Sequence, residues 1–227
     1  MPAVPAPLQL ALALDHAEKL TREDFLPGAS NVAALGMIDR WPDWPSRTLA
    51  LVGPRGSGKS HLASIWAKES GARFLSARAL HPAMLPGALA TGALVLEDCE
   101  AGTFDERTLF HLFNLAREEE AWLLLTARHA PAAWTVALPD LASRLRAIPA
   151  ATLSMPDDAL LRAVIVKMFG DRQLAVDESL VSYLLTRIER SFAHARAIVQ
   201  TIDREALRRK RPVNRALAAE LYREAGS

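Results

Sequence analysis

The order of apolar and polar residues along the chain changes character once, near residue 155. Between Arg47 and Ala150, short apolar runs alternate with stretches of helical spacing. This alternation is typical of a parallel β-sheet flanked by helices. The predicted strands are TLALV, RFLSA, ALVLE and AWLLLTA, which begin at Thr48, Arg73, Ala93 and Ala121, and the predicted helices are His61–Ser70 and Asp105–Glu119.

The two ends of the chain differ from this middle part. After Pro156 the apolar residues keep helical spacing and no strand is predicted. At the other end, Pro2, Pro5 and Pro7 precede a short apolar ladder, which indicates a loose arm. We therefore predict an arm at 1–22, an α/β domain at 23–155 and a small all-α domain at 156–227.

Composition narrows the class of protein. The 27 basic and 26 acidic side chains nearly cancel, so no strong field points to nucleic acid, and no sequence-specific DNA binding is expected. The basic run at 208–211 is interpreted as a solvated helix end rather than a DNA contact. A single cysteine, Cys99, suits a reducing compartment, and no apolar run approaches the length of a membrane span. We therefore expect a cytoplasmic protein.

The sequence GPRGSGKS follows the first predicted strand directly. Gly53, Gly56 and Gly58 permit backbone torsions that turn successive N–H groups inward around a phosphate. Lys59 adds a positive charge, and the Ser60 hydroxyl is a ligand for Mg²⁺. An incidental glycine-rich turn is the alternative, but the position between strand and helix favours a phosphate loop. The predicted nucleotide-binding residues here are Gly53, Pro54, Arg55, Gly56, Ser57, Gly58, Lys59, Ser60 and His61.

An acidic pair ends the strand ALVLE. Glu97 and Asp98 supply the carboxylates that a P-loop NTPase needs, one for Mg²⁺ and one to polarise the attacking water. Their order, Glu before Asp, departs from the usual Asp on the magnesium side. A solvated strand end is the alternative. With Ser60, both carboxylates are the predicted Mg²⁺ ligands.

Polar residues after the next strand leave more than one interpretation open. Thr126 lies in LLLTAR, and it either faces the terminal phosphate, caps a helix or belongs to an exposed loop. Farther on, Arg144 and Arg146 lie two residues apart, so they do not share a helix face. An arginine here either reaches a phosphate on a neighbouring subunit or forms surface ion pairs.

Taken together, the phosphate loop, the acidic strand end, LTAR, the Ser143-Arg144-Leu145 segment and the helical C-terminal part resemble the AAA+ ATPases. Upstream, DFLPGASN at 24–31 is similar to a segment of the DnaA branch of that superfamily. We expect no DNA-reading domain of the kind that DnaA initiators carry after their ATPase part. What remains resembles the Hda family of DnaA-related inhibitors of replication initiation.

This resemblance implies roles for particular residues. Arg144 matches the arginine-finger segment, so we expect it to act in trans on ATP bound by DnaA, with Glu97 and Asp98 at the chain's own site. In the lid, Ala193 stands where the family has a sensor arginine, and Arg196 follows one turn later as a candidate phosphate contact. We expect ADP or ATP with Mg²⁺ as ligand, ADP above all, and weak or absent intrinsic hydrolysis.

The arm supports the same resemblance. QLALAL at 9–14 is similar to the peptide with which many proteins bind the bacterial sliding clamp, the β subunit of DNA polymerase III. Leu12 and Leu14 would fill an apolar pocket while Gln9 bonds its rim. An ordinary amphipathic arm is the alternative. The predicted clamp-binding residues are Gln9, Leu10, Leu12 and Leu14.

The expected function is therefore that of a negative regulator that binds the DNA-loaded clamp and stimulates ATP hydrolysis by DnaA. DnaA and the clamp are the expected partners, and the sequence leaves room for a homodimer. Two other functions fit the motifs, a helicase loader of the DnaC kind and a stand-alone AAA+ ATPase. Retention on immobilised clamp separates the first function from both alternatives.

Overall fold

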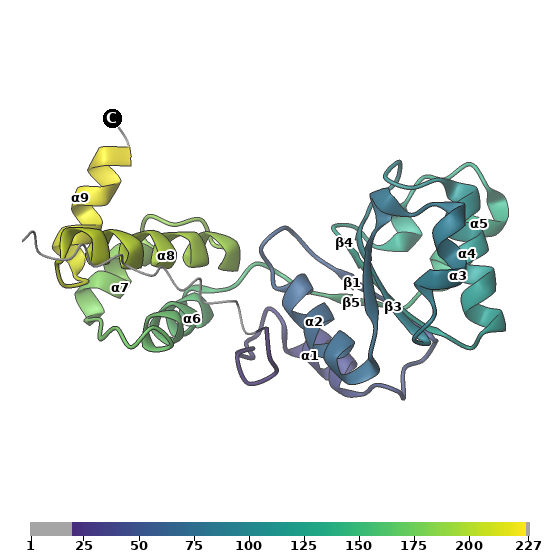
Figure 1. Ribbon diagram of the computed structural model, residues 1–227, viewed down its shortest axis with the longest axis horizontal. Helices are drawn as coiled ribbons and strands as arrows, with labels where there is room; N and C mark the ends of the chain where they lie inside the picture. Colours follow the sequence, from purple (N-terminus) through teal and green to yellow (C-terminus); the bar gives the residue numbers. More distant parts are fainter. Residues whose placement is uncertain (1–19, 226–227) are drawn as a thin grey trace, which may run out of the picture.

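The computed structural model describes residues 20–225 of the chain. An α/β core and a group of helices lie side by side along the long axis of the molecule (Figure 1). The linker between them follows the last strand of the core, so the helical part lies beyond the carboxyl edge of the sheet.

The core is built on a five-stranded parallel sheet with the strand order β2-β3-β4-β1-β5. The central strands are buried on both faces, which explains their nearly continuous apolar sequences. Four strands were predicted, and β5 was not. The strands are β1 Thr48–Val52, β2 Arg73–Ser76, β3 Ala93–Cys99, β4 Trp122–Ala127 and β5 Ala150–Thr152.

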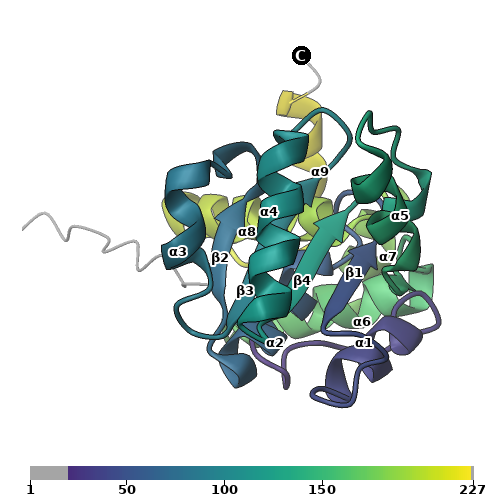
Figure 2. The same cartoon turned by 90° about the vertical axis from the view of Figure 1, so that its right-hand side faces the viewer.

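Helices cover both faces of this sheet. Two helices, α1 (Val32–Asp39) and α2 (Lys59–Ser70), pack on the face nearer the C-terminal helices. Trp66 of α2 is fully buried in this layer. Figure 2 shows β2, β3, β4 and β1 side by side behind α4, which covers the other face. That layer contains α3 (Leu85–Ala88), α4 (Glu106–Glu118) and α5 (Pro139–Ala147), with the short 3₁₀ turns Ala77–Ala79, Pro82–Met84 and Pro131–Ala133 nearby.

The C-terminal part is all helical, as predicted. Aspartate or serine side chains cap three of its helices: Asp157, Asp177 and Ser191 accept backbone N–H groups of the first turn. The helices enclose a separate apolar cluster around Phe169 and Val199. Their bounds are α6 Asp158–Gly170, α7 Glu178–Leu185, α8 Phe192–Arg209 and α9 Arg215–Ala225.

The basic run 208–211 forms the end of α8. Lys210 takes a left-handed conformation there and ends the helix. Arg209 forms ion pairs with Glu205, Glu220 and Glu224. These pairs join α8 to α9, which supports the interpretation of this run as a helix end.

None of the helices in the described part of the chain is long and apolar enough to cross a membrane.

Candidate functional site

The loop Gly53–Ser60 connects β1 to α2 and has the conformation that its glycines were expected to allow. Gly56 and Gly58 have φ values of 77° and 100°, where a side chain would be strained. Gly58 immediately precedes the first residue of α2, so the N-terminus of that helix faces the loop. The Lys59 ammonium donates to the carbonyl oxygens of Gly53 and Pro54, at 2.7 and 2.9 Å. The lysine charge therefore lies within the loop.

Burial and neighbouring charges act on Lys59 together. Burial is the main cause that lowers the pKa of this amine, and the positive charges of Arg128 and Arg55 lower it further. Asp98 and Glu100 act in the opposite direction. A bound polyphosphate would relieve the repulsion among these cations, so the charges suit an anionic ligand.

A second feature inside the loop also fits a ligand. Ser57 is 1% exposed, and its hydroxyl has no hydrogen-bond partner in the structure. Buried hydroxyl groups are normally satisfied, so an unsatisfied one in a loop of this shape indicates a missing polar partner. The residues of the phosphate loop therefore fit a nucleotide.

Of the three groups expected to hold Mg²⁺, the Ser60 hydroxyl and the Glu97 carboxylate lie close together. The Ser60 side chain acts on the Glu97 carboxylate of β3 and lowers its pKa, but it does not outweigh the opposing causes. Burial, followed by repulsion from Asp98, raises the pKa of Glu97. Within the described residues no group of three or more His, Cys, Asp or Glu side chains could hold a metal ion. Magnesium commonly uses one carboxylate together with nucleotide phosphates, and the Ser60–Glu97 pair fits that pattern.

Asp98 differs from Glu97 in conformation. The pairing of β3 with β4 shifts register between Leu96 and Cys99, and Asp98 lies in this irregularity with φ 55°, a conformation that Asp tolerates better than most residues. Its N–H donates to the Thr126 hydroxyl at 3.1 Å. Thr126 is 2% exposed, so its hydroxyl fixes the acidic turn from beneath. The open alternative for Thr126, direct contact with a phosphate, has no support in this geometry.

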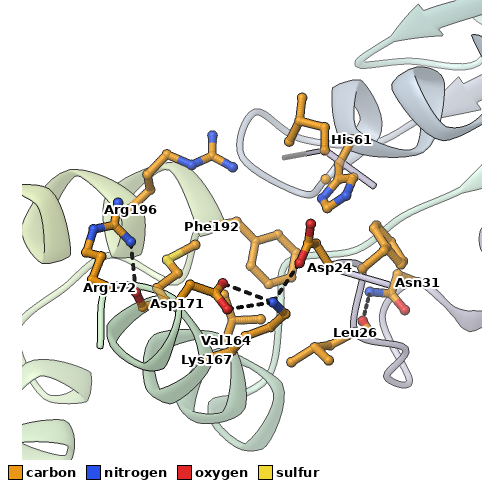
Figure 3. Close-up of a pocket in the computed structure, with 14 residues that line it drawn as sticks. Asp24, Leu26, Asn31, His61, Val164, Lys167, Asp171, Arg172, Phe192 and Arg196 are labelled. Atoms are coloured by element: carbon orange, nitrogen blue, oxygen red, sulfur yellow. Dashed lines mark hydrogen bonds and ion pairs between the residues drawn. The ribbon is translucent and has the colours of Figure 1, made fainter. Parts of the chain in front are cut away.

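A cavity of about 420 Å³ lies next to the phosphate loop, between the core and the C-terminal helices. That volume is within the range of small-molecule sites. Figure 3 shows residues of both parts around it, among them His61 from α2 and Lys167 from α6. His61 Nε2 lies 2.8 Å from the Thr21 carbonyl oxygen, and its ring packs edge-on against Phe25. The cavity would hold the part of a nucleotide that extends away from the loop.

One wall of this cavity is the segment 20–31, which contains the DnaA-like sequence. The buried Asn31 side chain organises it, because it accepts from the Gly28 N–H and donates to the Leu26 carbonyl oxygen. Asp24 then forms an ion pair with Lys167 of α6 at 2.7 Å, and Lys167 also pairs with Asp171 at 2.9 Å. The Asp24–Lys167 pair joins the core segment to the C-terminal helices across the cavity (Figure 3).

The start of α8 contacts the phosphate loop directly. The Phe192 N–H donates to the Gly56 carbonyl oxygen at 3.0 Å. A Cβ atom on Gly56 would lie only 2.7 Å from the Ser191 Cβ and 3.6 Å from that of Ala193. Position 193 therefore does face the loop, as the resemblance implied, and it carries no charge. Arg196, one turn later, lines the cavity (Figure 3).

Arg144 lies far from this site. It is on the last turn of α5, and its guanidinium bonds the Asn114 side chain and lies 4.7 Å from the Phe110 ring centre. It also lines a second hollow with Thr48 and Ala121, which lie where β1 and β4 begin. The phosphate loop follows the end of β1, so Arg144 and the loop lie toward opposite ends of the sheet. Arg146 is exposed, so the two arginines differ in environment as expected.

The predicted clamp-binding residues Gln9, Leu10, Leu12 and Leu14 lie outside the described residues. Sequence reasoning missed Glu100 and Arg128 beside Lys59, and the Asp24–Lys167 pair. Arg128 lies within the quoted sequence LTAR, where its charge was the available signal. The other two depend on chain segments that meet only in the folded protein.

No protein-family model matches this chain, and no curated protein matches it in sequence. Solved structures do match. Domain III of the Thermotoga maritima replication initiation protein DnaA is 19% identical with a TM-score of 0.72, over 90% of this chain and 96% of that one. DnaA from Aquifex aeolicus, in an AMPPCP-bound structure, is 21% identical with a TM-score of 0.66, over 82% of this chain and 65% of that one.

A third match is RuvB of Thermotoga maritima, a Holliday junction branch migration motor. It is 15% identical with a TM-score of 0.65, over 84% of this chain and 65% of that one. At these identities the similarity concerns the fold. The five-stranded parallel sheet, its flanking helices and the C-terminal helices of the described residues therefore have the fold of domain III of DnaA and of RuvB.

Proposed function

We propose that this chain is a DnaA-related regulator of the Hda type, which stimulates hydrolysis of ATP bound by DnaA and so represses replication initiation. The fold similarity to DnaA supports a common way of assembling. Arg144 is the residue that carries the proposal. It lies at the end of the core opposite the phosphate loop, which supports a contact with a nucleotide on another chain rather than with the chain's own.

The contacts of Arg144 favour the finger over the alternative of surface ion pairs. Among the described residues no carboxylate pairs with its guanidinium. The neutral amide of Asn114 and the ring of Phe110 hold it instead. Its full positive charge therefore remains available to phosphate oxygens, which a guanidinium binds through two parallel N–H groups.

The chain's own nucleotide has a structural role in this proposal. The phosphate loop, the lid and the segment 20–31 all contact one cavity, so a nucleotide there, which we expect to be ADP, would hold the core and lid together. The irregular backbone at Asp98 and the burial of Glu97 support weak intrinsic hydrolysis, because the usual pair of ionised carboxylates is altered. Recruitment to DNA would come from the sliding clamp through residues 9–14.

The test is a reconstituted reaction with clamp loaded on DNA, ATP-bound DnaA and this protein, in which conversion to ADP-bound DnaA is measured. Fingers supplied by a partner accelerate hydrolysis by roughly 10³ to 10⁵. Arg144→Ala should therefore lose most DnaA-dependent hydrolysis while keeping clamp and nucleotide binding. Arg146→Ala is the matched control and should stay near the parent rate.

Three results would contradict the proposal. Equal loss in both variants would mean that the end of α5 serves folding or docking. Near-parental hydrolysis by Arg144→Ala would mean that this residue is not the finger. A protein that is not retained on immobilised clamp, but binds single-stranded DNA and the helicase, would be a loader.

A further inference from the structure

One edge of the sheet is open. The strand β2 is the outermost strand on its side and pairs only with β3 (Figure 2). Within residues 20–225, the backbone groups of β2 form no hydrogen bond beyond this pairing. An unpaired edge offers a row of N–H and C=O groups to another strand, and natural proteins commonly cover or charge such edges.

The side chains at this edge favour an apolar partner with acidic groups. Phe74 of β2 is 46% exposed. The neighbouring Arg73 is directed toward α3, because its guanidinium donates to the Gly87 carbonyl oxygen at 2.7 Å. Arg78, just beyond the carboxyl end of β2, is exposed and has no ion-pair partner in the described part of the chain. Residues 71–96 contain no Asp or Glu, so this positive charge is not neutralised locally.

The first 19 residues of the chain, which lie outside the described part, contain a segment with this chemistry. Every second residue from Leu8 to Leu14 is leucine. An alternation of period two places all these leucines on one face of an extended strand. The acidic residues Asp15 and Glu18 follow. The segment therefore has the apolar face and the acidic end that the edge at β2 lacks.

The described chain begins close to the carboxyl end of β2. The Thr21 carbonyl oxygen lies 2.8 Å from His61 Nε2, at the start of α2. The preceding residue, Ser60, has its side chain near the Glu97 carboxylate, and Glu97 is the register partner of Ser76, the last residue of β2. Six residue steps, from 14 to 20, span up to about 20 Å, which is the scale of this path.

This starting point also sets the direction of the segment. Residue 14 would lie at the carboxyl end of β2 and residue 8 toward its amino end. The segment would therefore run parallel to β2, as all neighbouring strands of this sheet do.

We propose that residues 8–14 pair with the free edge of β2 and extend the parallel sheet by one strand, with their leucines against the Phe74 ring and Asp15 beside Arg78. Because the segment is tethered, its effective concentration at the edge is high and a short strand suffices. The same residues include the predicted clamp-binding peptide, so the arm cannot pair with β2 and enter a clamp pocket at once. This competition rests on the proposed function, whereas the pairing with β2 does not.

Hydrogen exchange on the full chain, without clamp or DnaA, tests the pairing. Amides within residues 9–14 of the parent protein should exchange about fivefold or more slowly than those of an unfolded segment. Phe74→Glu and, separately, Leu8→Asp should return them to the unfolded rates. Val166→Glu is the matched control, because Val166 is an apolar residue of α6 with 47% exposure, and it should leave the protection unchanged. Slow exchange of the β3 and β4 amides in every variant shows that the fold is intact.

Binding to immobilised clamp tests the competition. Leu8 and Phe74 lie outside the predicted clamp-binding residues, so both variants should bind clamp more tightly than the parent protein. Apparent affinity is divided by the fraction of molecules that are competent to bind, so the gain should equal the measured protection, about fivefold or more. Val166→Glu should bind clamp with the parental affinity.

Unfolded exchange rates for residues 9–14 in the parent protein would overturn the inference, and so would protection that survives both variants. Protection that falls on dilution would mean pairing with a second copy and would overturn the intramolecular contact. Clamp affinity that does not rise when protection is lost would overturn the competition. A parent protein and variants that all fail to bind clamp would refute the proposed function alone, because exchange is measured without clamp.

Discussion

The ion pair between Asp24 and Lys167 gives the sharpest prediction for stability. It joins the core segment 20–31 to α6 of the lid across 143 residues of sequence. Asp24→Asn keeps the size of the side chain and one acceptor oxygen but removes the charge. We expect the lid to unfold more readily in this variant, because a polar contact that ties it to the core is weakened.

The size of the effect follows from geometry and exposure. The two charged atoms lie 2.7 Å apart, and the side chains are 26% and 25% exposed. At an effective dielectric constant of about 20 the Coulomb attraction is roughly 6 kcal/mol, most of which desolvation and side-chain ordering offset. Lys167 also keeps Asp171 as a partner. A net loss of about 1 to 2 kcal/mol is expected, at the lower end of the range for hydrogen bonds to charged groups because Lys167 retains a partner.

The chain offers separate probes for its two parts. All five tryptophans lie between residues 41 and 134, within the core, whereas circular dichroism also reports the lid helices. In urea, Asp24→Asn should shift the dichroism midpoint down by about 0.5 M, given typical slopes of roughly 2 to 3 kcal/mol per molar. Tryptophan fluorescence should shift less, since the core keeps its own contacts.

Asp171→Asn is the matched control. Asp171 is half exposed and one helical turn from Lys167, so its pair is worth about 0.3 to 0.5 kcal/mol. Lys167 holds the pKa of Asp24 below its usual range, so this stabilisation is present above the unfolded pKa of about 3.9 and is lost as pH falls through the folded value. Equal shifts in the two variants, or a difference that persists at low pH, would refute the reasoning.

Three further outcomes are expected. ADP at about a hundred times its dissociation constant should stabilise the parent protein against thermal unfolding by about 2.7 kcal/mol. The Lys59→Ala variant should lose this stabilisation. If the melting temperature of the parent protein is the same with and without ADP, the nucleotide does not stabilise the fold. Glu97→Gln should weaken nucleotide binding in the presence of Mg²⁺ and leave binding in EDTA unchanged, which titrations in both buffers can check. Replacing Gln9, Leu12 and Leu14 by Ala should abolish clamp binding in a pull-down with intact ADP binding, and near-parental retention would move the docking site elsewhere.

Three of the four strands that the sequence predicted, β1, β3 and β4, are largely buried, and the fourth, β2, is a mostly exposed edge strand. The run Thr48–Val52 is bounded by turn residues and matches β1 residue for residue. β5 has three residues, two of them alanine, and it exists because Ala50–Val52 offers an edge to Ala150–Thr152. β5 therefore forms because it pairs with a strand that is distant in sequence, and the local sequence does not reveal this pairing.

In the candidate site, too, some features could be predicted from local sequence and others depend on contacts between distant segments. The phosphate loop and Glu97 could be located from local sequence, because a strand, glycines and polar groups occur at fixed spacing. Thr126 was singled out for its polarity, but its orientation depends on how β4 pairs with β3. The place of Arg128 beside Gly53 likewise follows from strand pairing, which a single sequence does not reveal.

The separation of Arg144 from the phosphate loop has a geometric consequence for assembly. In the proposed function one end of the core holds a nucleotide and the other supplies the arginine finger, so two such chains joined through these ends would meet head to tail. A twofold-symmetric pair presents the same patch twice, and therefore places neither finger in the partner's loop. Head-to-tail growth stays open at both ends unless it closes into a ring. A row of related ATPases joined in this way would therefore be polar, with a nucleotide site exposed at one end and an arginine at the other.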